Sequence, residues 1–188
     1  MRAEKPDRYR IGLENREIKS IEIDGQKVQG FKHHDNDGKV WKMYMVKSGE
    51  EVVYIGATTQ GIRNRLRGGL KAEGKGGYHG YHGYKWKDLN EVEILIWCFP
   101  TESKDTVEAL EAELVYLFRH HLGKWPKYQM EIHFHSDVTE DVTMTAKEIF
   151  NSIERGRYCC GRCRGTARCA PTRLSSVERK MCPKPGER

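Results

Sequence analysis

The chain lacks any long hydrophobic run, and no apolar stretch approaches the roughly 18 residues that a membrane-spanning helix needs. The first ten residues, MRAEKPDRYR, also lack the apolar stretch of a secretory signal. We therefore expect a cytoplasmic protein with no membrane partner. Cysteine is scarce before residue 154, where Cys98 is the only one and lies in an apolar run typical of a buried thiol. Without a secretory signal, the other five cysteines do not indicate a disulfide framework.

The chain does contain enough apolar material for one folded domain with polar extensions. Its 188 residues are 37% hydrophobic and 32% charged, which is typical of a globular protein. The charge is uneven, because residues 154–188 hold ten Lys or Arg against three Asp or Glu. We expect three parts, namely an extension with a possible hairpin over residues 1–37, a domain over residues 38–153, and a basic, cysteine-rich, disordered tail over residues 154–188.

The hydrophobic pattern predicts an α/β domain of the α+β type, with a small antiparallel central sheet of about three strands flanked by helices. Strands are expected at residues 40–46, 52–55 and 91–99. Helices are expected at residues 60–72, 103–121 and 145–153. The last helix would begin with a capping box, formed by Thr145 and Glu148. Residues 73–87 are expected to form a long loop, and residues 128–135 a short extended piece.

Two tyrosines lie on the first two expected strands. If these strands form a hairpin centred on Gly49, Tyr44 and Tyr54 become cross-strand partners on one face, with Cβ atoms about 5 Å apart. Their hydroxyl groups would then converge on one point, as a catalytic pair needs. The alternative is ordinary aromatic packing within the sheet.

One carboxylate lies on the apolar face of the helix expected at residues 103–121. Glu111 is four residues after Val107 and three before Leu114, inside a continuous apolar arc. A carboxylate there is expensive unless it is paired or binds a cation. The pattern therefore favours a functional Glu111, with a buried salt bridge to an arginine as the alternative.

Three arginines share the helix expected at residues 60–72. Arg63 and Arg65 flank opposite edges of its apolar stripe, whereas Arg67 points further toward solvent. A guanidinium at the stripe edge can reach a site on the sheet, where its geometry suits a phosphate. The helical geometry does not choose between Arg63 and Arg65, and either can be a plain surface arginine.

Basic and aromatic side chains gather between residues 59 and 87, which hold seven Lys or Arg and one acidic residue. Such a segment can contact phosphates and stack on bases, although glycine-rich aromatic loops also serve as packing elements. The candidates for nucleic-acid binding are Arg63, Arg67, Lys71, Tyr78, His79, Tyr81, His82, Lys85 and Lys87. A metal site at His79 and His82, or at His133 and His135, lacks further ligands nearby and is disfavoured.

The tail carries a Cys160-Gly-Arg-Cys163 segment with the spacing of a zinc knuckle. Its partners would be Cys169 and Cys182, which are thirteen residues apart rather than in a second pair of that spacing. The composition favours a basic arm that adds salt-sensitive affinity for nucleic acid over a zinc site. An extension with no function of its own is the third possibility.

Several of these segments, in this order, resemble the GIY-YIG nuclease family. The family's signature strand pair appears as Lys42-Met43-Tyr44 and an intact Tyr54-Ile55-Gly56. Residues 57–66 look like the family's turn into the helix that carries its arginine, and Arg65 matches that arginine better than Arg63 does. The resemblance covers about half of the chain.

Two further segments resemble the family, and two positions, Gly69 and Gln129, depart from its pattern. Residues 109–115 are similar to the helix that supplies the family's metal-binding glutamate, which places Glu111 in that role. Residues 126–129 resemble the closing Pro-x-Tyr-Asn element, with Gln129 in place of the asparagine. Gly69 stands where the family often has His or Tyr, and the loop candidates to supply that ring are Tyr78, His79 and Tyr81.

The resemblance implies metal-assisted hydrolysis of a phosphodiester bond. Glu111 would hold one divalent cation, Mg²⁺ or a similar ion, and Arg65 would bind the scissile phosphate. Tyr44 would activate or orient the attacking water, and Tyr54 would hold the hydrogen-bond network. Gln129 and Gly56 would support the site.

We therefore expect a DNA endonuclease of restriction, mobile-element or repair type, acting on double-stranded DNA as a monomer or homodimer. The first alternative is a non-catalytic nucleic-acid-binding module on the same fold, suggested by Gly69 and Gln129. The second is a zinc-dependent interaction protein that acts through its cysteine-rich tail.

Overall fold

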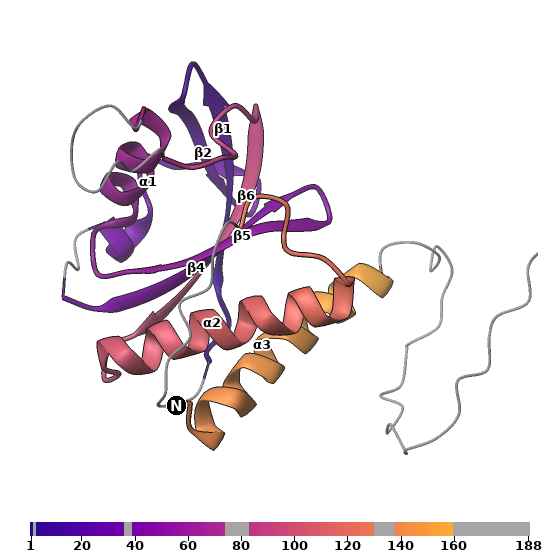
Figure 1. The fold of residues 1–188 in the computed structure, drawn as a ribbon. Helices are drawn as coiled ribbons and strands as arrows, with labels where there is room; N and C mark the ends of the chain where they lie inside the picture. The colour runs from indigo at the N-terminus through magenta and orange to yellow at the C-terminus, as the bar shows by residue number, and fades with distance from the viewer. Residues whose placement is uncertain (2, 36–38, 74–82, 130–137, 160–188) are drawn as a thin grey trace, which may run out of the picture.

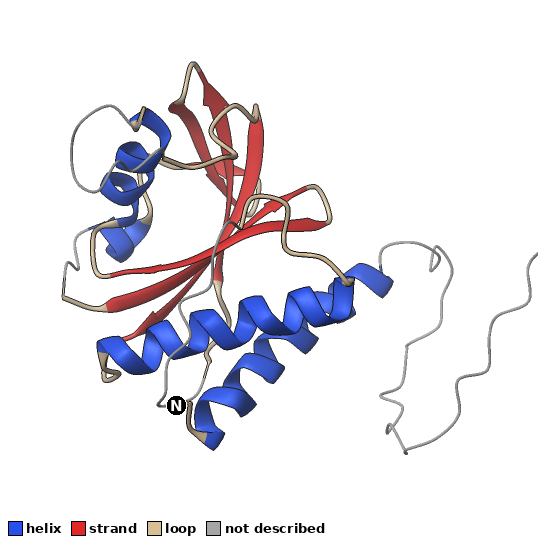
Figure 2. Ribbon diagram, viewed as in Figure 1, coloured by secondary structure: helices blue, strands red, loops and turns tan. Residues whose placement is uncertain are grey.

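The computed structural model describes residues 1, 3–35, 39–73, 83–129 and 138–159. The fold is α+β, with a six-stranded antiparallel sheet and three α-helices (Figures 1 and 2). The strands are β1 (Asp7–Glu14), β2 (Glu17–Ile23), β3 (Gln26–Lys27), β4 (Trp41–Ser48), β5 (Glu51–Thr58) and β6 (Glu91–Phe99). The helices are α1 (Ile62–Lys71), α2 (Lys104–Leu122) and α3 (Glu140–Cys159), with a short 3₁₀ helix, η1 (Lys32–Asp35).

The sheet separates two hydrophobic cores. Its strand order is β3-β2-β1-β6-β4-β5, so β5 is an edge strand next to the long central strands. Helix α1 covers one face, and α2 with α3 covers the other (Figure 1). Strand β4 alternates between them: Met43 and Met45 pack in the α2/α3 core, whereas Tyr44 and Val46 pack in the α1 core. The site described below lies mainly on the α1 face.

The helix that carries Glu111 has clear end signals. The side chain of Ser103 accepts a hydrogen bond from the backbone N–H of Thr106 at 3.2 Å, which caps the N-terminus of α2. Gly123 ends the helix in the left-handed conformation, with φ of 69°. Seven buried apolar residues hold α2 against the sheet: Val107, Ala109, Leu110, Ala112, Leu114, Val115 and Phe118.

The sheet is larger than the expected three strands. The hairpin expected within residues 1–37 is present, and its turn at Asp24-Gly25 joins β2 to β3. Strand β1 pairs with β6, so residues 7–27 extend the same sheet. On β1, the side chains of Tyr9, Ile11 and Leu13 are buried, and they alternate with Arg8, Arg10, Gly12 and Glu14. Half-buried strands of this kind look polar when only composition is considered.

Two local predictions are wrong. A bulge between Val46 and Lys47 shifts the β4–β5 register, so Tyr44 lies opposite Gly56, and Tyr54 lies opposite Val46. The two tyrosines are therefore diagonal neighbours on one face, not direct partners. The last helix begins at Glu140 rather than 145, because the hydroxyl of Thr139 accepts a hydrogen bond from the N–H of Val142 at 3.3 Å.

Within the described residues, no helix combines the length and the apolar character that a membrane-spanning segment requires.

Candidate active site

Three polar side chains, from strand β4, from helix α1 and from the loop that precedes β6, meet on the α1 face of the sheet. Tyr44 of β4 is fully buried, and its hydroxyl oxygen lies 2.8 Å from the hydroxyl oxygen of Tyr84. The Nε of Arg65, on α1, donates to the same Tyr44 hydroxyl at 3.4 Å. The Arg65 guanidinium also lies 5.9 Å from the centre of the Tyr84 ring, within cation–π range. These three residues form the tyrosine–arginine cluster.

Gly56 leaves the space that the Tyr44 ring occupies. A Cβ atom at position 56 would lie 2.8 Å from the Tyr44 hydroxyl oxygen and 2.9 Å from the Tyr54 ring, closer than side chains tolerate. The Tyr54 ring lies 6.0 Å from the Tyr44 ring and 5.4 Å from the Tyr84 ring. The Tyr-Ile-Gly triplet thus supplies one aromatic wall of the site and the gap beside it.

Tyr84 occupies the position left open by Gly69. A Cβ atom on Gly69 would lie 2.0 Å from the Tyr84 ring, and the Tyr84 N–H donates to the Gly69 carbonyl at 2.8 Å. The ring also stacks on Trp86 at 4.5 Å between centres. Gly69 and Tyr84 together therefore place a phenol beside Tyr44, from a loop instead of from the helix.

Sequence reasoning missed Tyr84. The loop residues proposed for its role, Tyr78, His79 and Tyr81, lie outside the described residues. Two features of the sequence point to Tyr84. A Gly-Tyr pair occurs three times between residues 77 and 84, and the last of these pairs is Gly83-Tyr84. Gly69 also lies on the buried side of a helix. Neither feature by itself connects the loop to that helix.

The neighbouring glycines of α1 are expected to respond to alanine in opposite ways. Gly69→Ala should lower the free energy of unfolding by about 2 kcal/mol or more, because the buried Tyr84 ring has no room to retreat from Trp86. Gly68→Ala should raise it by about 0.5–1 kcal/mol, because position 68 is exposed with open space around its Cβ. Urea denaturation measures both. Equal effects of the two substitutions would contradict the Tyr84 placement.

The structure separates Arg63 from Arg65. Arg65 is half-buried and points into the cluster, where the Tyr44 oxygen beside it raises the pKa of its guanidinium. Arg63 instead donates to the backbone carbonyl of Gln29, near the β2–β3 hairpin. Of these two arginines, Arg65 is therefore the one that contacts Tyr44.

The Tyr84 hydroxyl is held in its protonated form. Burial, followed by the nearby Tyr44 oxygen, raises the pKa of Tyr84 well above its usual value of 10.0. A protonated Tyr84 can donate to the Tyr44 oxygen. Two donors, Arg65 Nε and Tyr84 Oη, then converge on that single atom.

Glu111 approaches the same end of the edge strand from the opposite face. Its carboxylate accepts a backbone hydrogen bond from Ala57, the residue that follows Gly56 on β5. Burial, and secondly repulsion by Glu108, raise the pKa of Glu111 to about 7, and the charge of Arg65 opposes that rise. Glu111 and Arg65 thus interact electrostatically at this end of β5, although α2 and α1 cover different faces.

The Glu111 carboxylate, with Glu108 nearby, is the kind of oxygen ligand that a hard divalent cation with few protein ligands uses. Within the described ranges, no group of three His, Cys, Asp or Glu side chains could hold a metal ion. Mg²⁺ commonly uses one or two carboxylates and completes its shell with water and phosphate oxygens. A carboxyl whose charge is disfavoured by burial and by Glu108 also gains from a nearby cation. Glu111 could therefore hold Mg²⁺ in the presence of a phosphate.

Stability should depend on the charge of Glu111. In the metal-free protein, Glu111→Gln is expected to raise the free energy of unfolding above pH 7 by on the order of 1–3 kcal/mol, because ionised Glu111 is disfavoured in the folded state. The pKa of Glu111 is about 7 in the folded protein, above its usual value of 4.5. The free energy of unfolding of the wild-type protein therefore falls as the pH rises from about 4.5 to about 7. Below pH 4.5 the difference should vanish. Urea denaturation across this range tests it, and a destabilised variant above pH 7 would contradict it.

Gln129 fixes the outer edge of β5. Its side-chain oxygen accepts a hydrogen bond from the Ile55 N–H at 3.0 Å, and the Tyr128 N–H donates to the Val53 carbonyl at 2.9 Å. The segment therefore covers the exposed edge of the strand that carries the Tyr-Ile-Gly triplet. Gln129 supports the strand backbone and does not itself join the tyrosine–arginine cluster through these contacts.

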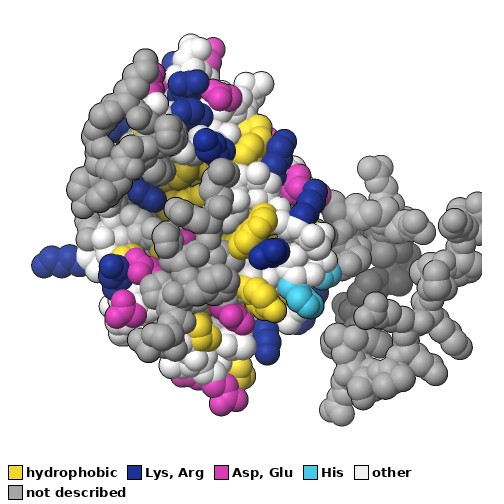
Figure 3. Space-filling model, in the orientation of Figure 1, with side chains coloured by type: hydrophobic (Ala, Val, Ile, Leu, Met, Phe, Trp, Pro, Cys, Tyr) yellow, Lys and Arg dark blue, Asp and Glu magenta, His cyan; other side chains and the backbone are white. Residues whose placement is uncertain are grey.

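The expected nucleic-acid contacts are only partly described. Arg67 and Lys85 are exposed, Lys71 forms an ion pair with Glu17 at 2.7 Å, and Lys87 donates to the Ala72 carbonyl at 2.8 Å. Tyr78, His79, Tyr81 and His82 lie outside the described residues, as do His133, His135 and most of the cysteine-rich tail. In Figure 3, basic side chains alternate with acidic ones on the visible described surface. The surface there is mixed, not uniformly positive.

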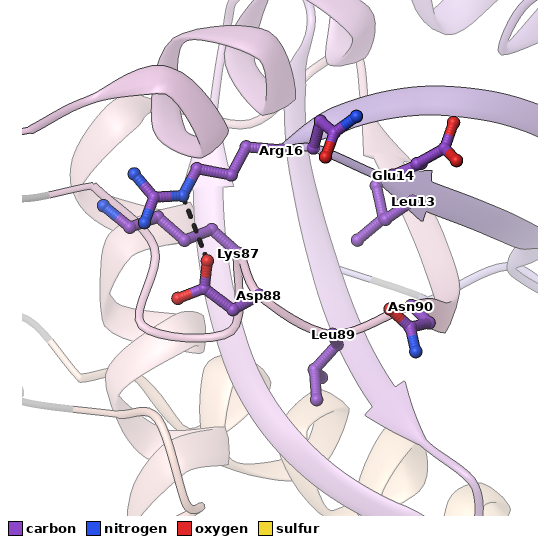
Figure 4. Close-up of a pocket in the computed structure, with 8 residues that line it drawn as sticks. Leu13, Glu14, Arg16, Lys87, Asp88, Leu89 and Asn90 are labelled. Carbon is purple, nitrogen blue, oxygen red and sulfur yellow. Dashed lines mark hydrogen bonds and ion pairs between the residues drawn. The ribbon is translucent and has the colours of Figure 1, made fainter.

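A separate polar pocket of about 330 Å³ lies between the β1–β2 turn and the residues that precede β6 (Figure 4). An ion pair from Arg16 to Asp88, at 3.0 Å, crosses it, and Lys87 lines its wall. None of the residues of the tyrosine–arginine cluster lines this pocket.

Comparison of the chain with protein-family models, with curated proteins and with solved structures found no match.

Proposed function

We propose that this chain is a metal-dependent endonuclease, similar to GIY-YIG nucleases, that hydrolyses phosphodiester bonds in DNA. The observation that carries the proposal is the convergence of Arg65 and Tyr84 on the Tyr44 hydroxyl, with the carboxylate of Glu111 near the adjoining residue Ala57. A guanidinium and a carboxyl that can hold a cation supply the positive charge that stabilises the transition state of phosphodiester hydrolysis, and the phenol adds an oxygen that can hold the attacking water.

Arg65 would bind the scissile phosphate and offset the negative charge that builds up in the transition state. Its partial burial strengthens that interaction, because fewer water molecules compete with the phosphate. Glu111 would hold the divalent cation, which when bound polarises the phosphate and stabilises the leaving oxygen. Because α1 and α2 cover opposite faces of the sheet, Arg65 and Glu111 would stay on separate sides of β5 before the substrate binds.

Tyr44 would orient the attacking water and accept its proton. A free phenol has a pKa of about 10 and is a poor base at neutral pH. Here the Arg65 guanidinium supplies a positive charge beside the Tyr44 oxygen, and the Tyr84 hydroxyl supplies a second hydrogen bond to the same oxygen. The buried Tyr84 keeps its own proton and so remains a donor during this step.

The proposal is tested by incubating the purified protein with plasmid and phage DNA, with Mg²⁺ in one series and EDTA in the other. We expect nicked or linear DNA in the Mg²⁺ series only, because one site cuts one strand at a time. A parallel series with RNA distinguishes the substrate. Absence of cutting on every substrate with Mg²⁺ or Mn²⁺ would overturn the proposal.

One observation favours the alternative of a nucleic-acid-binding module without catalysis. The pKa of Glu111 is about 7, so part of this carboxyl is neutral near neutral pH when no cation is bound. If the protein only binds nucleic acid, it would shift the mobility of DNA in the same gels without cutting it.

The role of the tail, including a zinc site, stays a prediction. The metal content of full-length and tail-truncated protein tests it.

A further inference from the structure

A second reactive cluster lies on the same sheet face, near the end of β6. The Sγ of Cys98 lies 3.0 Å from Nδ1 of His34, and Nε2 of the same imidazole lies 2.7 Å from Oδ2 of Asp7. These residues come from β6, η1 and β1. Lys32 contacts the other oxygen of Asp7 at 3.2 Å. Thiol, imidazole and carboxylate therefore stand in one hydrogen-bonded row.

The carboxylate fixes the orientation of the imidazole. Burial alone would raise the pKa of Asp7, but hydrogen bonds from His34 and Lys32 outweigh it and lower that pKa. An ionised Asp7 accepts a hydrogen bond, so the proton on Nε2 of His34 points to it. Nδ1 then faces the thiol. The His34 side chain is only 3% exposed and packs edge-on against Tyr9, which prevents the ring from turning away.

This arrangement is suited to forming a thiolate. The Cys98 proton can move along the Sγ–Nδ1 contact to His34, and the resulting imidazolium is stabilised by Asp7. Lys42 is the cross-strand partner of Cys98 on β4, and its buried ammonium donates to the backbone carbonyls of Val40 and Thr59. Cys98 is also partly exposed, and is not the fully buried thiol expected from its apolar surroundings in the sequence.

We propose that Cys98 is a modification site, a thiolate activated by His34 and Asp7 that reacts with hydroperoxides. In this reaction the Cys98 sulfur attacks one peroxide oxygen, an S–O bond forms and the O–O bond breaks. The sulfur is oxidised by two electrons to the sulfenic acid, and the peroxide is reduced. The departing hydroxide takes the proton from Nδ1 of His34 and leaves as water. The proposal is independent of the nuclease activity proposed above.

The test follows Cys98 alone within the whole protein. Trypsin releases residues 88–104 as one peptide in which Cys98 is the single cysteine. Labelling with iodoacetamide at mildly acidic pH, followed by mass spectrometry of this peptide, gives the rate at Cys98. We expect the folded protein to react at least about tenfold faster than the guanidinium-unfolded chain, where the thiol has a pKa of about 8.5. After hydrogen peroxide, the same peptide should carry a dimedone adduct, which reports the sulfenic acid.

Variants of His34 and Asp7 show whether these residues activate the Cys98 thiol or whether it reacts only because it is exposed. Asp7→Asn and His34→Gln should each bring the rate down to that of the unfolded chain or below. Asp7 is partly exposed, so Asp7→Asn keeps the test valid if His34→Gln fails to fold. The matched control is Asp24→Asn, an exposed turn position with φ of 51°, where asparagine fits equally well. Wild-type labelling no faster than that of the unfolded chain, an Asp7→Asn rate equal to wild type, or no dimedone adduct would each overturn the proposal.

Discussion

Replacing Glu111 by glutamine is expected to reduce the rate of Mg²⁺-dependent DNA cleavage by on the order of a thousandfold. Glutamine keeps the size of the side chain and can still accept the backbone hydrogen bond from Ala57, so the fold should survive. What it removes is the negative charge that would hold the cation. Initial rates of plasmid nicking over a range of Mg²⁺ concentrations measure the effect.

The matched control lies on the same helix. Glu113→Gln makes the same chemical change outside the apolar arc of α2, and it should leave the nicking rate within about twofold of wild type. A Glu111→Gln variant that cuts as fast as wild type would remove Glu111 from the site. Equal losses in both variants would indicate a general effect of the charge of α2.

Arg65→Ala is expected to reduce the cleavage rate by on the order of a hundredfold to a thousandfold. Arg65 donates to the Tyr44 hydroxyl and faces Tyr84, so its loss removes both the phosphate ligand and the positive charge beside the proposed base. Both effects act on the chemical step. Single-turnover cleavage at saturating protein measures the loss apart from DNA affinity.

Arg63→Ala is the control for this experiment. Arg63 lies two residues away on α1 but donates to the Gln29 carbonyl, outside the tyrosine–arginine cluster. Its loss should weaken DNA binding at most, and the single-turnover rate should stay close to that of wild type. A larger loss for Arg63→Ala than for Arg65→Ala would reverse the assignment.

The helical part of the site was predictable from the sequence because helical periodicity is local. Glu111 was singled out by its place among apolar residues on α2, and the structure puts it at the sheet with a raised pKa. The choice of Arg65 over Arg63 depends on the family resemblance, because the two arginines flank opposite edges of the same apolar stripe and helical geometry does not distinguish them. The contact of Arg65 with Tyr44 is what separates it from Arg63.

The remaining parts depend on contacts between segments that are distant in the chain. The register of Tyr44 against Gly56 follows from a bulge that the alternation of β4 and β5 does not reveal. Tyr84 enters the site because Gly69, on helix α1, leaves room for its ring. Gly69 is thirteen residues after Gly56 in the chain and fifteen before Tyr84. The row of Cys98, His34 and Asp7 joins three elements whose pairing is not encoded in any one of them.

The same principle accounts for the larger sheet. Strand β1 alternates apolar with charged residues, and its pairing with β6 across some eighty residues of chain is a tertiary event. Composition alone makes such a strand look like a polar extension. Its six register pairs with β6 place Asp7 beside the end of that strand, within reach of His34.

One gel assay tests the central claim most directly. Wild-type protein, Glu111→Gln, Arg65→Ala and the controls Glu113→Gln and Arg63→Ala are incubated side by side with supercoiled plasmid and Mg²⁺, each with an EDTA lane. We predict that wild type and both controls cut the plasmid, that Glu111→Gln and Arg65→Ala leave it intact, and that EDTA stops all cutting. Cutting by Glu111→Gln and Arg65→Ala at the wild-type rate would contradict the account.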